Sequence, residues 1–267
     1  LDNALSIGSV GMMGCSRAGN LAVQNSDLLL VLGCRLNTMT TGEELQKFAR
    51  EAKIVIVDID QIEHSKDTIK IDRLVIADVK KTLRELIKND QKTSMNNWIE
   101  KCSHWKEIFP KCEDQFKSSK DVDLYYLAES LSHTLPENST FISDSGLIEL
   151  MLPTNISFKK GQRCIHPSSQ GSMGFALPGI IGAHYASEGP IVSVIGDGSV
   201  MMNLQELETI SYNKIPAKIF IVNNNAYAVI RKRQIDLFRS RTIGVDPSDG
   251  ISCPNFIKSL GVASKQQ

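Results

Sequence analysis

The chain has 267 residues, 42% of them hydrophobic, and its 30 basic residues balance its 30 acidic residues. This length can bury one large core or two moderate ones, and the neutral balance argues against nucleic-acid and membrane-surface partners. No apolar run approaches the roughly 20 residues that span a bilayer, and the N-terminus lacks a signal-peptide pattern, so we expect a cytoplasmic protein. The six cysteines lack CxxC or zinc-ligand spacing, which favours buried thiols over disulfides or a metal centre.

The first part of the chain alternates predicted strands with predicted helices. The apolar run at 27–33 predicts a strand that is covered on both faces, since it has no polar alternation. The remaining elements expected in this part are a helix before this strand that carries Ala18, Leu21, Ala22 and Asn25, a helix at 43–50, strands at 54–60 and 74–76, and a helix at 79–87. Such alternation predicts a parallel sheet and therefore an α/β fold.

Two features of this part resemble nucleotide-binding signals. Glycines at positions 8, 11 and 14 precede the first clear strand instead of following one, so they fail the context of a dinucleotide fingerprint and are interpreted as a tight turn. Asp58 and Asp60 end a strand, as ribose-binding acids do, but solvated acids are common at strand ends. An oxidoreductase that binds NAD or FAD through these residues is the alternative of another class.

A second α/β pattern follows a polar, lysine-rich segment. Residues 91–120 are predicted to form a helical connecting arm, with a helix at 98–108 that places Trp98, Cys102 and Trp105 on one face. The elements expected after it are helices at 124–135 and 175–185 and strands at 140–143, 191–195 and 219–222. We therefore divide the chain into a first α/β domain at 1–90, the arm at 91–120 and a second α/β domain at 121–267.

Polar residues follow two consecutive strands of the second domain. Asp197 comes directly after the strand at 191–195, and Asn224 follows the strand at 219–222, 224 − 197 = 27 residues later. A strand, a helix and a returning parallel strand of this length bring both side chains to the carboxyl edge of the sheet, where ligands of open α/β sheets bind. Carboxylate and amide oxygens suit Mg²⁺, which takes its remaining ligands from phosphates and water. The pair predicts a magnesium and diphosphate site.

Neighbouring residues fit the same interpretation. Gly198 would let the backbone approach a phosphate, and Ser199 would add a hydroxyl at the start of a helix. Asn203 and Glu206 have the spacing of a capping box, so we assign them to helix initiation. No nucleophile or histidine lies within the motif, so the chemistry is expected to come from a bound cofactor.

The stretch GDGSVMMNLQELETISYNKIPAKIFIVNNN resembles the signature of thiamine diphosphate-dependent enzymes, and it is most similar to acetolactate synthase-like members. The stretches GMMGCSRAGNLAVQNSDLLLVLGCRLN and GSMGFALPGIIGA resemble the central and diphosphate-binding domains of that family. The resemblance implies two parallel-sheet three-layer domains: a partial Rossmann-like central domain and a C-terminally incomplete thiamine diphosphate-binding domain. It also implies a homodimer or homotetramer and a longer enzyme, whose N-terminal domain supplies the glutamate that activates the cofactor.

The resemblance assigns roles by position and names no catalytic side chain in this chain. It implies that Mg²⁺ is held by Asp197, Asn224 and the backbone of Ala226, and that Met173 wedges beneath the cofactor rings. The other cofactor contacts that it implies are Ser145, Gly146, Gly171, Gly196, Gly198, Ser199, Tyr227 and Val229.

The chain departs from the family pattern at three places. Leu147 and Ile148 replace a Gln-His pair of acetolactate synthases, so relatives in sugar or polysaccharide pathways look more similar. Arg35-Leu36-Asn37 matches the flavin-contacting loop only in part, so FAD is an alternative cofactor that we do not expect. Alanine replaces glycine at Ala226 and Ala228, which would strain the backbone if Ala226 required a positive φ.

These observations predict a transferase or lyase that uses thiamine diphosphate and Mg²⁺. It would form or cleave a carbon–carbon bond of a 2-oxo acid by decarboxylation and carboligation. Decarboxylation alone, or hydrolysis of a diketone, is the alternative on the same scaffold. A further alternative is a noncatalytic chain that keeps the fold only as a scaffold.

Overall fold

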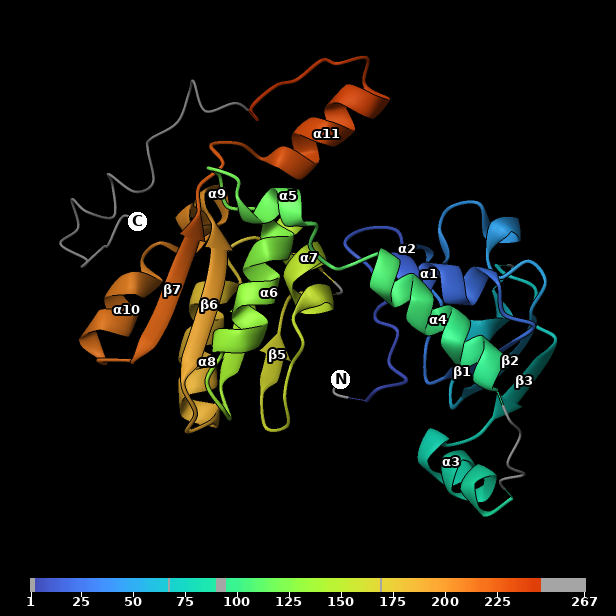
Figure 1. The fold of residues 1–267 in the computed structure, drawn as a ribbon. Helices are drawn as coiled ribbons and strands as arrows, with labels where there is room; N and C mark the ends of the chain where they lie inside the picture. Colours follow the sequence, from blue (N-terminus) through green and yellow to red (C-terminus); the bar gives the residue numbers. More distant parts are fainter. Residues whose placement is uncertain (1–2, 67, 90–94, 169, 246–267) are drawn as a thin grey trace. The chain divides into compact units, whose positions relative to one another are not determined.

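The computed structural model describes residues 3–66, 68–89, 95–168 and 170–245. The chain divides into two compact units, one formed by residues 3–113 and the other by the residues from 114 onward. Each unit contains a parallel sheet with flanking helices (Figure 1), so the predicted α/β class with two parallel sheets is confirmed.

The first unit has a three-stranded sheet in the order β1-β2-β3. Its strands are β1 (Leu28–Leu32), β2 (Lys53–Asp58) and β3 (Arg73–Ile76). Its α-helices are α1 (Arg17–Gln24), α2 (Thr38–Thr41), α3 (Val79–Lys88) and α4 (Asn96–Ile108), with 3₁₀ turns η1 (Leu45–Lys47) and η2 (Glu63–Ser65).

Two expectations for this unit are wrong. The strand at 27–33 is not covered on both faces, because it forms edge strand β1, in which Leu28 and Leu30 are 58% and 44% exposed. Central strand β2 is the buried one. The helix expected at 43–50 is replaced by the single 3₁₀ turn η1, since Gly42 ends α2 with φ 86° and Ala49 has φ 44°. Positive φ values interrupt a right-handed helix.

Helix α4, which lies within the predicted arm, packs against α1. Arg17 of α1 pairs with Glu113 at 2.9 Å and lies over the ring of Phe109. Trp98 and Trp105 meet edge to face with ring centroids 5.8 Å apart, as their helical spacing predicts. The polar middle segment thus contributes a packed helix to the first unit.

The second unit has a four-stranded parallel sheet in the order β5-β4-β6-β7. Its strands are β4 (Thr140–Ser143), β5 (Arg163–Ile165), β6 (Ile191–Gly196) and β7 (Ala217–Val222). Its helices are α5 (Asp114–Lys117), α6 (Leu124–Thr134), α7 (Leu147–Asn155), α8 (Ala176–Ala186), α9 (Asp197–Val200), α10 (Glu206–Tyr212) and α11 (Ala228–Leu237), with the 3₁₀ turn η3 (Met201–Asn203).

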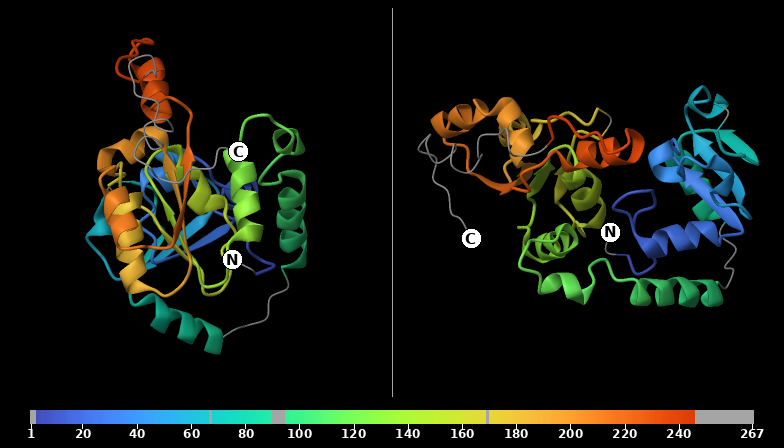
Figure 2. Two further views of the ribbon diagram at one scale, coloured as in Figure 1. Left: turned by 90° about the vertical axis from the view of Figure 1, so that its left-hand side faces the viewer. Right: turned by 90° about the horizontal axis from the view of Figure 1, so that it is seen from above.

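Strand alternation divides the core of this unit into two halves. Phe141, Val192 and Val194 face α6 and α7, whereas Ile142 and Ile195 face α8 and α10. The sheet therefore lies between two helical layers (Figure 1). Helix α11 has no buried residue and projects from this unit (Figures 1 and 2).

The capping box expected at Asn203 and Glu206 is wrong. Asn203 lies in η3, and its side-chain amide donates to the Gly174 carbonyl at 2.9 Å. Helix α10 begins without a side-chain cap. Asn203 therefore bonds to a residue 29 positions earlier in the chain instead of capping the helix that follows it. Within the described part of the chain, no helix is both long and apolar enough to cross a membrane.

Candidate cofactor site at the edge of the second sheet

One cavity of about 240 Å³ lies at the carboxyl edge of the second sheet. All twelve predicted site residues line it: Ser145, Gly146, Gly171, Met173, Gly196, Asp197, Gly198, Ser199, Asn224, Ala226, Tyr227 and Val229. They converge because β4, β6 and β7 are parallel neighbours, so the turns that follow these strands meet at one edge. The loop that precedes α8 adds Gly171 and Met173.

Six further residues complete the lining, and all are apolar: Leu124, Leu147, Ile148, Val222, Ala228 and Ile230. Three of them stand at positions where the chain departs from the resembled family. Leu147 and Ile148 therefore place hydrocarbon, not an amide and an imidazole, beside the cavity.

Oxygen atoms gather at the Asp197 corner of the cavity. The two carboxylate oxygens accept hydrogen bonds from the backbone nitrogens of Gly198 at 3.0 Å and Asn225 at 2.9 Å. The second bond joins the turn after β7 to the end of β6 and so brings Asn224 next to Asp197. Carboxylate oxygens can accept more than one bond, so both retain capacity for a cation.

The backbone conformation of this turn does not require a positive φ at Ala226, so the alanine there causes no strain of that kind. The positive φ, 50°, falls on Asn225, and Ala226 is not among the described non-glycine residues with positive φ. Asn tolerates this conformation better than most residues. No group of three His, Cys, Asp or Glu suited to a metal occurs in the described ranges. A cation here would instead bind carboxylate, amide and carbonyl oxygens, which is the donor set that Mg²⁺ prefers.

Gly198 is required by a neighbouring aromatic ring. A Cβ at this position would lie 2.3 Å from Cε1 of Tyr227, closer than any real contact. The ring of Tyr227 thus lies against the Gly-Asp-Gly turn at the cavity wall. The sequence interpretation attributed Gly198 to phosphate approach, and the structure adds this second reason.

Ser199 is only 5% exposed, and its hydroxyl donates to Oδ1 of Asp144 at 2.6 Å. Its proton is therefore not directed at the cavity, and the contact that Ser199 can donate to an anion is its backbone N–H. Asp144 was not among the residues selected from the sequence. It directly follows β4, so the rule that selected Asp197 could have selected it too.

Met173 lies in a glycine-bounded turn before α8. Gly171 and Gly174 adopt φ values of 60° and 78°, and the Met173 side chain is partly exposed in the cavity wall. Ser145 secures the start of the turn, since its Oγ donates to the Gly171 carbonyl at 2.7 Å. The turn thus presents a large flexible side chain from a fixed backbone.

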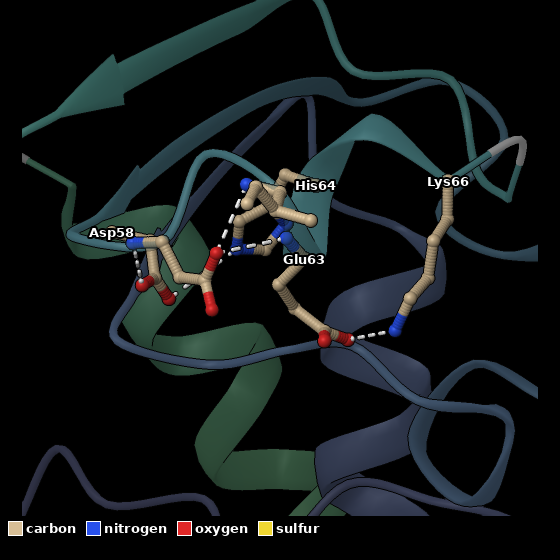
Figure 3. Close-up of polar contacts among 6 residues, drawn as sticks. Asp58, Glu63, His64 and Lys66 are labelled. Carbon is tan, nitrogen blue, oxygen red and sulfur yellow. Dashed lines mark hydrogen bonds and ion pairs between the residues drawn. The ribbon is translucent and has the colours of Figure 1, made fainter.

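The acids of the first unit are arranged differently (Figure 3). Asp58 is buried, accepts from the Asp60 backbone nitrogen at 3.0 Å and lies 3.3 Å from Nε2 of His64. These two contacts lower the pKa of Asp58, the backbone bond contributing most. Asp60 accepts from the backbone nitrogens of Ile62 and Glu63. Both carboxylates close the turn after β2 instead of lining a cavity.

A second cavity in the first unit, of about 210 Å³, is lined by α1, the loop that contains Gly11, and α2 with the residues that follow it. One of its polar side chains, Asn20, forms two bonds with the Gly11 backbone, donating at 2.9 Å and accepting at 3.0 Å. The Gly-rich segment therefore forms a tight turn, as expected. Its glycines do not open a phosphate loop after a strand.

Comparison with known families agrees with both units. Residues 1–86 match the model of the thiamine pyrophosphate enzyme central domain, and residues 144–266 match that of the C-terminal TPP-binding domain. The chain belongs to the thiamine pyrophosphate enzyme family. The cavity lies within the match to the TPP-binding domain, apart from the lining contributed by Leu124.

Similar curated proteins of this family are acetolactate synthase large subunits. The chain is 32% identical to that of Cyanidium caldarium over 266 residues, which is 96% of this chain and 44% of the relative. It is 31% identical to that of Buchnera aphidicola over 258 residues, 95% of this chain and 44% of the relative. Isozyme 1 of Escherichia coli K12 is 32% identical over 232 residues, 86% of this chain and 40% of the relative. The chain thus spans less than half the length of these relatives.

Proposed function

We propose that this chain is the cofactor-holding part of a thiamine diphosphate- and Mg²⁺-dependent enzyme that forms or cleaves a carbon–carbon bond of a 2-oxo acid. The observation that carries the proposal is the convergence of all twelve predicted residues on one cavity. The bond between Asp197 and the Asn225 nitrogen supports the metal assignment, because it brings the carboxylate next to the amide-bearing turn. A homodimer or homotetramer is part of this proposal, as is a cytoplasmic location.

The residues of the chain would bind and orient the cofactor. Asp197, the Asn224 side chain and the Ala226 carbonyl would hold Mg²⁺. The backbone nitrogen of Ser199 would face the diphosphate, and Gly198, whose own nitrogen donates to Asp197, would let the backbone approach it closely. Met173 would support the rings from below, and Ser145, Gly146, Gly171, Gly196, Tyr227 and Val229 would complete the contacts. The cofactor supplies the means to stabilise a carbanion next to a carbonyl.

The apolar side chains of Leu147 and Ile148 favour a reaction other than acetolactate synthesis itself. They offer no hydrogen bond to a polar acceptor at positions where acetolactate synthases carry Gln and His. We propose a related carboligation, as in sugar or polysaccharide biosynthesis, with simple decarboxylation or diketone hydrolysis as the alternative. A screen of 2-oxo acids separates these outcomes. Carboligation releases CO₂ and gives a longer product, and decarboxylation releases CO₂ and gives an aldehyde. A diketone hydrolase releases no CO₂ and gives neither product.

Titration calorimetry of the full-length protein tests the proposal. Thiamine diphosphate should bind only with Mg²⁺, and Asp197→Ala should weaken binding at least about 100-fold, the equivalent of roughly 2.7 kcal/mol. Asp60→Ala is the matched control, because it removes a strand-end carboxylate from the other sheet and should leave the affinity unchanged. Wild-type protein that binds no cofactor with Mg²⁺ would refute the proposal. Binding of NAD or FAD that survives Asp197→Ala would support the oxidoreductase alternative instead.

A further inference from the structure

A fully buried carboxylate lies beneath the cavity wall. Asp144 is 0% exposed and stands at the end of β4. It accepts four hydrogen bonds: from the Ser145 nitrogen at 2.8 Å, the Gly174 nitrogen at 3.0 Å, the Ala176 nitrogen at 2.7 Å and the Ser199 hydroxyl at 2.6 Å. A buried carboxylate is costly unless such bonds satisfy it. Its donors come from three separate segments of the chain.

Two of these donors belong to the turn that carries Met173. The nitrogens of Gly174 and Ala176 bind the two different oxygens of Asp144, which fixes both the position and the direction of the turn. The Asn203 amide holds the Gly174 carbonyl at 2.9 Å from the opposite side. A Cβ on Gly174 would lie 2.8 Å from that of Met202, so this turn is also tightly packed against η3.

The fourth donor comes from the Gly-Asp-Gly motif. Ser199 lies two residues after Asp197, and its hydroxyl shares Oδ1 of Asp144 with the Gly174 nitrogen. One carboxylate oxygen therefore joins the helix that follows the proposed metal ligand to the turn that carries Met173. Both donors lie later in the chain, 30 and 55 residues after Asp144.

We propose that Asp144 is a positioning residue that sets Met173 relative to the diphosphate anchor, with Ser199 as the link between them. The inference rests on the proposed function, since Met173 matters only if the cavity holds the cofactor rings. Asp144 lines no part of the cavity and acts through other residues. Apolar packing would have filled its place with less desolvation cost, which favours a geometric role over one in stability alone.

Ser199→Ala tests the link in the full-length protein, because it removes one hydroxyl and keeps the backbone N–H. Ser193→Ala is the matched control: Ser193 is a fully buried serine of β6 whose hydroxyl has no hydrogen-bond partner in the described part of the chain. Three quantities are measured: amide hydrogen exchange of residues 173–176 without cofactor, the Kd of thiamine diphosphate with Mg²⁺, and the rate of deuterium exchange at C2 of the bound cofactor.

Ser199→Ala should accelerate amide exchange at Gly174 and Ala176 about 10-fold and slow C2 exchange about 10-fold, as expected from loss of one hydrogen bond to a charged group. The Kd should rise less than about 5-fold, because Asp197 and Asn224 still hold the other end of the cofactor. Asp144→Asn, which cannot accept from both turn nitrogens, should change both exchange rates in the same directions by more. Ser193→Ala should change none of the three quantities.

Exchange rates in Ser199→Ala that equal those of Ser193→Ala would overturn the inference while leaving cofactor binding intact. Additive effects of Asp144→Asn and Ser199→Ala would also overturn it, because two residues joined in one network should show coupling in a double-mutant cycle. A wild-type protein that fails to bind thiamine diphosphate would instead refute the proposed function, so the two failures are distinguishable.

Discussion

The two parallel sheets both end in acidic residues at their carboxyl edges, but they use those acids differently. In the first unit, Asp58 and Asp60 accept from backbone nitrogens two or three residues further on, and Asp78 caps α3 through the nitrogen of Lys81. In the second unit, Asp197 accepts from Asn225, 28 residues away, and Asp144 accepts from residues 30, 32 and 55 positions away.

The sequence separation between an acid and its hydrogen-bond donors distinguishes acids that close a local turn from acids at the candidate ligand site. Local partners close the loop to which the acid belongs and leave no cavity beside it. In the second unit the distant partners lie on loops and turns that meet where neighbouring strands end, so these bonds hold three segments of the chain together at the edge that carries the cavity. A strand-end carboxylate therefore indicates a ligand site when a loop from a neighbouring strand faces it.

Among changes outside the proposed metal ligands, the largest effect should come from Gly198→Ala. The new methyl group would displace the ring of Tyr227 and so distort the cavity wall, and we expect the affinity for thiamine diphosphate with Mg²⁺ to fall at least about 30-fold, roughly 2 kcal/mol. Calorimetry measures the change. Gly182→Ala is the control, because this glycine of α8 does not line the cavity and an added Cβ would meet nothing within 4 Å.

A double mutant shows whether the ring is the cause. Gly198→Ala should have little further effect in a Tyr227→Ala background, since the obstructing ring is gone. If the loss persists undiminished there, the glycine acts through the backbone alone, as the sequence interpretation supposed.

The next effect concerns the apolar side chains of Leu147 and Ile148 in the cavity lining. Ile148 is 5% exposed and packs in the core, so Ile148→His should lower the free energy of unfolding by about 2 kcal/mol, because an imidazole would be buried without a partner. Leu147→Gln, at a half-buried position, should cost less than about 1 kcal/mol. Urea denaturation monitored by circular dichroism compares the two. Equal costs would contradict the burial difference.

A smaller effect is expected for the pH dependence of the stability that Asp58, at the end of β2, contributes. Because hydrogen bonds lower the pKa of folded Asp58, its contribution to stability is fully present above the unfolded value of about 3.9 and is lost as pH falls through the folded pKa. Asp58→Asn should therefore reduce stability near neutral pH, and the difference from wild type should shrink below about pH 4. Denaturation curves at several pH values measure it. A difference that grows as pH falls would contradict this sign.

The smallest effect should follow from Asp78→Ala. Loss of the N-cap bond to the Lys81 nitrogen costs a helix about 1 kcal/mol locally, and α3 has no buried residue that would transmit the loss to the core. Amide exchange in the first turn of α3 should accelerate, while thiamine diphosphate affinity stays unchanged. A change in cofactor affinity would contradict this prediction, because it would show that the carboxyl edge of the first sheet affects the cavity of the second unit.

Much of the architecture follows from local patterns. The alternation of strands and helices is correct, and β4 falls at the expected residues. Strand β5 and helices α7 and α11 were missed, since β5 has three residues, α7 contains Pro153 and α11 lacks an apolar stripe. All twelve predicted site residues line one cavity. Asp197, Gly198, Ser199 and Asn224 were selected because they follow strand ends, whereas the resemblance to the family implied the remaining assignments.

By itself, the sequence determined three features: two α/β patterns, a carboxylate and an amide 27 residues apart, and a bulky residue between two glycines. These are local features, set by periodicity, turn chemistry and chain length. Only the tertiary structure decided that β1 exposes one face, that Tyr227 covers Gly198, and that Asp144 joins Ser199 to the Met173 turn. Those facts depend on which distant segments meet, and no local pattern records the partner of a buried polar group.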